Sequence, residues 1–330
     1  MDRDQQELQF LGFFGIVKES FKIIFSWRKI FSQITLALIL PLAFVFLAHI
    51  QVTQILFFKI LNNQESLEYG TMDYAKISHK ISSEWTAFWL FKIAFFTFLL
   101  ILSLLSTSAV VYTIACIYTS KPITFKKVMS VVPRVWKRLM VTFLWSFAIV
   151  FIYNVIAAAV FIFWLVLSGG NSVFGIAILV LLLLFYFSGF LYVTIVWHLA
   201  SVVSVLEEIY GIKAMIKSKN LIKGKIGVAV ALFILLGICF AGIQLLFEVF
   251  VVLQWPQDLI IRIGMGIICF LLLFKVILFG LVIQAVLYFV CKSYHHENID
   301  KSSLSSHLEA YLGEYVPLKA ANVQMEQVQA

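Results

Sequence analysis

The chain has 330 residues, of which 62% are hydrophobic and only 13% carry a charge, and its mean hydropathy is +1.00. Soluble domains are roughly half apolar and about a quarter charged, so this composition excludes a soluble domain and indicates an integral membrane protein. The net charge of +8 does not indicate nucleic-acid binding. The bases lie beside apolar stretches, where they orient a membrane protein and meet anionic headgroups.

Six long apolar stretches predict six membrane-spanning helices. A helix needs about 20 apolar residues to cross a bilayer. The stretches are continuously apolar rather than alternating, which favours helices over the strands of a membrane barrel. We place the spans near 33–58, 87–118, 139–167, 173–205, 226–254 and 262–291.

The connections between the spans differ in length and charge. A polar loop is predicted over 59–86, whereas SGGNS at 168–172 and QWPQD at 254–258 are short turns that make antiparallel hairpins. Nineteen of the twenty-five Lys and Arg lie in the N-terminus, the 119–138 and 206–225 connections, and the stretch that follows span six from residue 292 onward. The positive-inside rule therefore places both termini in the cytoplasm.

These boundaries divide the chain into three parts. An N-terminus over 1–32 holds an amphipathic helix, a six-span membrane domain covers 33–292, and a cytoplasmic polar tail covers 293–330. The tail is more apolar over 311–318 than a free linker needs. Two interpretations remain open: a docking peptide for a protein partner, or a short helix that folds back onto the bundle.

A basic segment recurs before three of the spans. In TFKKVMSVVPRVWKRL (124–139), apolar residues recur at helical spacing and bases take the other face, which predicts an amphipathic helix in the membrane interface. Pro133 is predicted to bend it. Superimposing Trp27, Trp136 and Ile222 aligns this segment with GIVKESFKIIFSWRKI and GIKAMIKSKNLIKGKI, although the third copy lacks the tryptophan.

The repeat unit is therefore a basic helix, a span, a turn and a returning span, present three times. Two spans per unit place all three basic helices on one face of the membrane. The predicted fold is an all-α polytopic membrane helix bundle, with six transmembrane helices in three tandem hairpin repeats, each preceded by a basic amphipathic interfacial helix. The alternative is that the cytoplasmic loops are basic and aromatic without being repeats. The bases expected to face headgroups are Lys18, Lys22, Arg28, Lys29, Lys126, Lys127, Arg134, Lys137, Arg138, Lys213, Lys217, Lys223 and Lys225.

A few polar residues lie inside the spans. Lys275 lies near the middle of span six, where a lysine costs on the order of 3 kcal/mol. It is either a functional residue, forming an intramembrane polar site with Asn154 and Gln284, or a structural ammonium paired within the bundle, for instance with Asn154. Lys92 and Glu248 lie at similar depth on spans two and five, so we expect a structural ion pair between them.

No arrangement of side chains in the sequence indicates catalysis or a metal site. His49 and His198 are single imidazoles without a second ligand at metal spacing, and we interpret them as packed or interfacial. The adjacent carboxylates Glu207 and Glu208 point in different directions on a helix and make a poor acid–base pair. We attribute Glu207 to a helix start and neighbouring lysines. We therefore expect no enzymatic activity, no cofactor and no bound metal.

Two segments resemble known families. SVVSVLEEIYGIKAMIKSKNLIKGK resembles part of the membrane domain attached to some bacterial glycerophosphoryl diester phosphodiesterases, and the tail HLEAYLGEYVPLKAANVQ resembles the C-terminus of a plant family of six-span proteins without an established activity. The resemblance implies the membrane-domain fold without the phosphodiesterase, because that module needs a soluble barrel of about 250 residues. No catalytic residue carries over. The positions that match the bacterial segment are Glu207, Gly211, Ala214, Ser218, Leu221 and Gly224.

Two functions fit these features. The first is a non-enzymatic protein of the endoplasmic reticulum, another endomembrane or the plasma membrane, whose basic cytoplasmic face binds anionic headgroups or stabilises a lipid-facing scaffold. Each base near an anionic surface contributes about 1 kcal/mol to such binding. The alternative is a carrier or channel for a small polar solute or ion, with Lys275, Asn154 and Gln284 lining a path. That function requires a continuous polar cavity between the spans.

Overall fold

The structure is a computed structural model that describes residues 8–68, 74–121, 123–168, 173–253, 255 and 258–295. Over these residues the chain is helical, without a strand. The turn at 169–172, most of the turn at 254–258 and the tail from residue 296, with its predicted docking segment, lie outside the described residues.

Six helices are long and apolar enough to cross a membrane. The prediction of an all-α bundle with six candidate spans is confirmed, and these helices indicate an integral multi-pass membrane protein. The helices that contain the spans are α4 (Leu40–Glu68), α5 (Tyr74–Tyr118), α6 (Phe125–Ser168), α7 (Val173–Leu206), α9 (Ile226–Phe247) and α10 (Leu259–Tyr294).

Two of the three basic segments form separate short helices. The first is α2 (Phe13–Ser26), followed after Trp27 by α3 (Arg28–Ile34) and the π-helical turn η1 (Thr35–Ile39), which leads into α4. The third is α8 (Ile212–Leu221), and a second π-helical turn, η2 (Glu248–Val252), ends the span that follows it.

The second basic segment is not a separate helix, because α6 runs through it as one element that contains Pro133. Proline removes one backbone hydrogen bond from a helix interior. Here Val132, Val135 and Leu139 are all buried in the main core on either side of the proline ring. Packing on both sides of the proline keeps the helix continuous.

The predicted polar loop over 59–86 is helical over 59–68 and 74–86, so that prediction is wrong for most of the segment. Polar side chains pair across the two helices. The Lys59 ammonium lies 3.6 Å from the Glu84 carboxylate, and Asn63 Nδ2 donates to Glu84 Oε2 at 2.6 Å. These contacts extend the α4–α5 hairpin beyond its apolar part.

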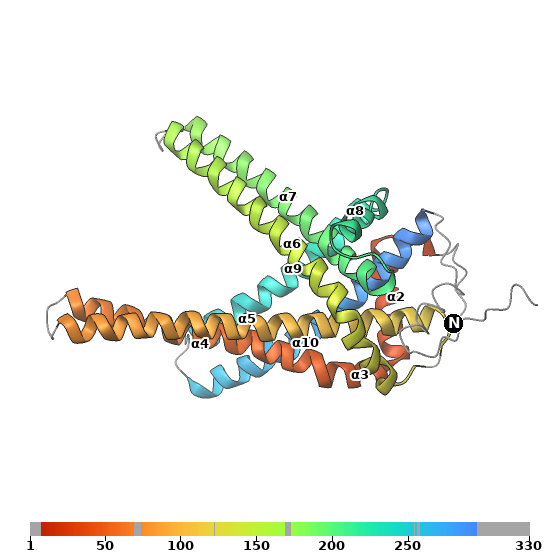
Figure 1. Ribbon diagram of the computed structural model, residues 1–330, viewed down its shortest axis with the longest axis horizontal. Coiled ribbons are helices and arrows are strands. Elements are labelled where there is room, and N and C mark those ends of the chain that lie inside the picture. Colours follow the sequence, from red (N-terminus) through yellow and green to blue (C-terminus); the bar gives the residue numbers. More distant parts are fainter. Residues whose placement is uncertain are drawn as a thin grey trace, which may run out of the picture.

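The returning spans α5, α7 and α10 contact one another and form the centre of the bundle. Their buried residues gather in three stretches, 104–117, 195–206 and 282–291, which lie near the end of the bundle that carries α2, α3 and α8. We call this the basic end, and the opposite one the distal end. Toward the distal end the α6–α7 hairpin diverges from the α4–α5 hairpin (Figure 1).

The three units close into a ring through their basic segments. Each segment packs on the returning span of the preceding unit: α6 on α5, α8 on α7, and α2 on α10. Tandem parallel repeats around an axis normal to the membrane produce this kind of arrangement. All three basic segments therefore surround the same end of the central three-helix core.

Candidate functional site

The basic end carries a large excess of positive charge. Among the described residues, it contains sixteen Lys and Arg but only three acids, Glu19, Glu207 and Glu208. Of the thirteen bases predicted to face headgroups, nine are exposed on the protein surface: Lys18, Lys22, Arg28, Lys29, Lys126, Arg134, Lys137, Lys213 and Lys223.

The other four predicted bases are half-buried. Lys217 Nζ lies 2.7 Å from Glu207 Oε2, so its charge is used inside the protein. Lys225 Nζ donates to the Leu11 carbonyl at 3.5 Å and lies over the Tyr294 ring. These two lysines therefore contact the protein, and their contact with headgroups stays a prediction. Lys127 and Arg138 also have interactions within the protein.

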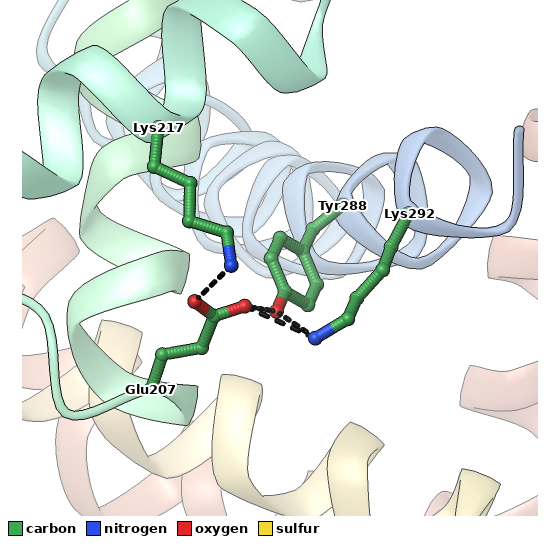
Figure 2. A network of polar contacts seen from close by, with 4 residues as sticks. All are labelled: Glu207, Lys217, Tyr288 and Lys292. Atoms are coloured by element: carbon green, nitrogen blue, oxygen red, sulfur yellow. Dashed lines mark hydrogen bonds and ion pairs between the residues drawn. The ribbon is translucent and has the colours of Figure 1, made fainter. Parts of the chain in front are cut away.

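A cluster of polar side chains forms around Glu207, directly after the last residue of α7 (Figure 2). Tyr288 Oη donates to Glu207 Oε1 at 2.6 Å, and Lys292 Nζ donates to the same oxygen at 3.1 Å. Lys217 from α8 bonds the second oxygen. Figure 2 shows Lys217 approaching from one side and the two α10 residues from the other. The carboxylate therefore ties the end of α7 to the middle of α8 and to the last turns of α10.

The charge state of Glu207 follows from these contacts. Burial alone would raise the pKa of its carboxyl, since the side chain is only 14% exposed. The hydrogen bonds from Lys217 and Tyr288 and the charge of Lys292 outweigh burial and hold the pKa below its ordinary value. Glu207 is thus an ionised, fully engaged carboxylate, which suits a structural link rather than a general base. The predicted contact with lysines is present, whereas α8 begins only at Ile212.

The segment between α7 and α9, which includes α8, needs small residues at particular positions. Gly211 has φ +66°, and its N–H donates to Thr142 Oγ1 at 2.8 Å. Ser218 is buried and its hydroxyl donates to the Val196 carbonyl at 2.8 Å. At Gly224, where φ is +88°, a Cβ would overlap the Tyr294 ring. Backbone with positive φ favours glycine, which explains why glycine occupies residues 211 and 224.

Two open grooves on the basic end bring bases and polar groups together. One, of ≈ 630 Å³, follows α8, and His295 Nε2 closes one side by donating to the carbonyls of Leu221 and Lys223. The other, of ≈ 560 Å³, joins the first two units and includes Trp27, Arg28 and Lys29. The first groove is lined by Lys213, Ile216, Lys217, Asn220, Leu221, Lys223 and His295.

The three residues predicted to form an intramembrane polar site lie in separate places. Lys275 is exposed and forms no hydrogen bond or ion pair with any residue the structure describes. Asn154 accepts a hydrogen bond at 2.8 Å from Tyr186 of the same hairpin. Gln284 bonds His198 instead, with Nδ1 and Oε1 2.9 Å apart. Lys275 and Asn154 therefore do not pair, and the three residues do not line a common path.

The predicted ion pair between Lys92 and Glu248 does not form either. Lys92 Nζ donates to His49 Nε2 at 3.2 Å, and Glu248 is exposed without a partner among the described residues. The reason is the packing order, because α5 packs on α4, α6, α7 and α10, whereas η2 packs on α4, α9 and α10. Similar depth in the membrane did not bring the two side chains together.

An open cavity of ≈ 480 Å³ lies between α4, α5, α7, α9 and α10, and both His198 and Gln284 line it. The sequence contained no signal for this contact, since the two residues are 86 positions apart. Within the described ranges, no group of three or more His, Cys, Asp or Glu could hold a metal ion.

Comparison with known proteins identifies the family of the chain. Residues 1–328 match the family model described as a domain of unknown function (DUF8558). No curated protein and no solved structure matches the chain. Because the match covers almost the whole sequence, this six-span chain belongs to the DUF8558 family.

Proposed function

We propose that the protein is a non-enzymatic membrane protein whose basic end faces the cytoplasm and binds anionic lipid headgroups in an endomembrane or the plasma membrane. The observation that carries the proposal is the surface charge of this end. Nine predicted bases are exposed there. Of the three acids, Glu207 already bonds two lysines and Glu19 is buried. Glu208 has an interaction within the protein as well. Apart from Arg134, which also interacts within the protein, the exposed bases are left for a ligand.

Exposed aromatic side chains accompany these bases on α2 and at the joint that follows it. Phe14, Phe25 and Trp27 are exposed beside Lys18 and Lys22. Such a surface suits the boundary between headgroups and acyl chains, where aromatic rings enter the apolar layer and lysines remain at the phosphates. Exposing three large aromatic rings to water would be unfavourable, whereas burying them in the apolar layer of a membrane is favourable.

The two basic grooves supply places where a phosphate could be bound rather than merely attracted. In the α8 groove, Lys213 and Lys223 are exposed and Asn220 offers an uncharged donor. Phosphate groups are bound by such combinations of ammonium groups and neutral donors. Since each base near an anionic surface contributes about 1 kcal/mol, two bases in one groove favour anionic over zwitterionic lipid.

The carrier or channel has less support. That function needs Lys275, Asn154 and Gln284 to line one path, and they lie in three different surroundings. An enzymatic function also lacks support, because Glu207 is engaged on both oxygens.

The test uses the purified full-length protein and two short-chain lipids, dioctanoyl phosphatidic acid and dioctanoyl phosphatidylcholine. We expect tighter binding of the phosphatidic acid, and a loss of about tenfold or more in its affinity for the variant Lys213→Gln/Lys223→Gln. The control variant Lys59→Gln/Lys275→Gln removes the same charge away from the basic end and should bind like the wild type. Equal affinity for both lipids, or equal losses in both variants, would refute the proposal. The orientation of the protein in the membrane is tested with Lys213→Cys, which a membrane-impermeant thiol reagent should label when it is applied from the cytoplasmic side.

A further inference from the structure

We propose that the cavity between the spans is a binding site for an uncharged membrane alcohol of the sterol type, with its hydroxyl group at Gln284 and His198. This site is separate from the basic end, and no Lys or Arg among the described residues lines it. Binding at this site therefore does not depend on headgroup binding at the basic end.

The cavity has a polar floor and apolar walls. Along α10 it extends from Val276 to Gln284, and along α7 from Thr194 to His198, so that Gln284 and His198 lie at the side nearer the basic end. Phe46 and Phe240 line it on the side nearer the distal end. A molecule lying here would place its polar group toward the basic end and its apolar body toward the middle of the membrane.

Gln284 provides the first sign of a missing ligand group. The residue is only 3% exposed, and its amide Nε2 has no hydrogen-bond partner among the residues that the structure describes. Most buried polar groups in proteins are paired, and an unpaired one destabilises the fold. In a membrane no bulk water is present to reduce that cost. A ligand oxygen that accepts a hydrogen bond would remove it.

His198 defines the complementary half of the site. Because the Gln284 Oε1 atom can only accept, His198 Nδ1 donates to it across 2.9 Å. The Nε2 atom of the neutral imidazole is then an acceptor. A hydroxyl group can accept from Gln284 Nε2 and donate to His198 Nε2. If the Gln284 amide is turned over, a hydroxyl still satisfies the atom that is left, because it both donates and accepts.

The lining also limits the rest of the ligand. Within the described part of the chain, no Asp, Glu, Lys or Arg lines the cavity, which argues against a phosphate or a charged amine. Ser103 and Thr194 are polar and also line the cavity, and the Thr194 hydroxyl donates to the Phe190 carbonyl. A sterol has one polar group, which matches the single polar pair at the floor. The two ester carbonyls of a diacylglycerol would lie against apolar walls.

The walls suit a rigid ring system. Phe233 and Phe240 of α9 face the cavity together with aliphatic residues of α4, α5 and α10. A rigid ligand loses less conformational entropy on binding than flexible chains do. Gly237 also lines the cavity, and a Cβ added there meets no atom within 4 Å. A large side chain at residue 237 can therefore fill the cavity without displacing the helix.

The experiment measures photolabelling of the purified full-length protein by a diazirine sterol that carries a free hydroxyl. We expect labelling that unlabelled sterol competes away and that dioctanoyl phosphatidic acid does not. Gly237→Phe should reduce labelling about tenfold. Gly242→Phe, on the same helix, places an identical ring where an added Cβ also meets nothing within 4 Å but outside the cavity. Labelling of this control should match that of the wild type.

A second variant tests the hydrogen bonds and keeps the proposal testable if Gly237→Phe does not fold. Gln284→Leu keeps the size of the side chain and removes the amide, and we expect about a tenfold loss of labelling, the effect of one or two hydrogen bonds. A sterol ketone, which accepts but does not donate, should compete more weakly than the alcohol against the wild type. Any one of four results would overturn the proposal. Unlabelled sterol could fail to compete, or Gly237→Phe and Gly242→Phe could be labelled equally. Labelling of Gln284→Leu could be unchanged, or diacylglycerol could compete more strongly than sterol.

Discussion

The half of the bundle near the basic end and the half near the distal end are built from the same six spans but differ in how closely they pack (Figure 1). In the basic half, α5, α7 and α10 are buried over 104–117, 195–206 and 282–291. In the distal half, large apolar side chains face outward, such as Phe163 at 67% exposed and Phe185 at 75%. The sequence is apolar in both halves, so hydrophobicity alone does not decide which half packs.

Small residues and hydroxyl groups distinguish the packed half. Ser106, Thr113 and Ser204 are buried and donate to carbonyls four residues earlier in their own helices, at 2.7, 2.8 and 2.9 Å. Such side chains are short and internally satisfied, so neighbouring backbones can approach. Lipid tails are as apolar as leucine, which leaves close packing and polar contacts to hold helices together in a membrane. The same substitution should therefore cost more in the basic half than in the distal half.

Removing the charge of Glu207 should have the largest effect. Glu207→Gln leaves Lys217 and Lys292, both largely buried, without their counter-charge. Breaking a buried pair typically costs 3–5 kcal/mol, and because these lysines retain some exposure we expect the free energy of unfolding to fall by about 3 kcal/mol. Unfolding of the purified protein in mixed detergent micelles measures this change.

The matched control is Glu248→Gln in the distal half, where the carboxylate is exposed and has no partner among the described residues. We expect it to lose no more than about 0.5 kcal/mol. Comparable losses in the two variants would contradict the difference between the halves.

The effect of Glu207 should also depend on pH. Its folded-state pKa lies below the ordinary value of 4.5, so the carboxylate stabilises the fold fully above pH 4.5, and the stabilisation is lost as the pH falls through the folded-state pKa. The difference between wild type and Glu207→Gln should therefore stay constant from pH 7 to about pH 5 and shrink below pH 4.5. A difference that grows on acidification would show that another group is responsible.

A methyl group at residue 224 should have the next largest effect. Gly224→Ala combines a strained φ of +88° with overlap between the new Cβ and the Tyr294 ring. Backbone strain of this kind costs about 1–3 kcal/mol, so we expect a loss of about 2 kcal/mol in the free energy of unfolding. Gly242→Ala, at an open position in a helix, should be neutral or stabilising by up to about 1 kcal/mol. Equal destabilisation of both variants would count against the argument from positive φ.

The Thr142 hydroxyl should contribute less than Gly224. It lies 2.7 Å from the Ser204 hydroxyl and accepts from the Gly211 N–H, so Thr142→Val leaves buried polar atoms unpaired. We expect a loss of about 1.5 kcal/mol. The control is Thr97→Val in the distal part of α5, where the exposed hydroxyl donates to the Ile93 carbonyl of its own helix and to no other described residue. A change at Thr97 as large as that at Thr142 would be the contradicting result.

The features that the sequence predicted are those with a local signal. The spans were predictable because a run of about 20 consecutive apolar residues is long enough to cross a bilayer as a helix. The basic segments were predictable because their apolar residues recur at helical spacing beside basic residues. Two other features had no such signal. The α4–α5 extension is polar, so hydropathy does not detect it, and the continuity of α6 through Pro133 depends on buried valines on both sides.

The polar contacts were hardly predictable, because their partners are distant in the sequence. Glu207 was matched to lysines by proximity along the chain, which applies to Lys217, but Tyr288 and Lys292 lie 81 and 85 positions away. Lys92 and Glu248 were paired by depth alone, and depth does not specify which spans are neighbours. The ring order of α5, α7 and α10 determines these contacts, and a single sequence does not reveal it.

The smallest effect is expected for a carboxylate in the distal extension. Glu84 lies 3.6 Å from Lys59, whose side chain is 61% exposed, and accepts a hydrogen bond from Asn63. Ion pairs with an exposed partner contribute about 0–1 kcal/mol, and the amide in Glu84→Gln can still accept from Asn63. We therefore expect a loss of about 0.5 kcal/mol, reduced further by salt, whereas the loss in Glu207→Gln should change little with salt. Because both variants exchange one carboxylate for one amide, a loss at Glu84 equal to that at Glu207 would mean that the distal hairpin is held as firmly as the packed half.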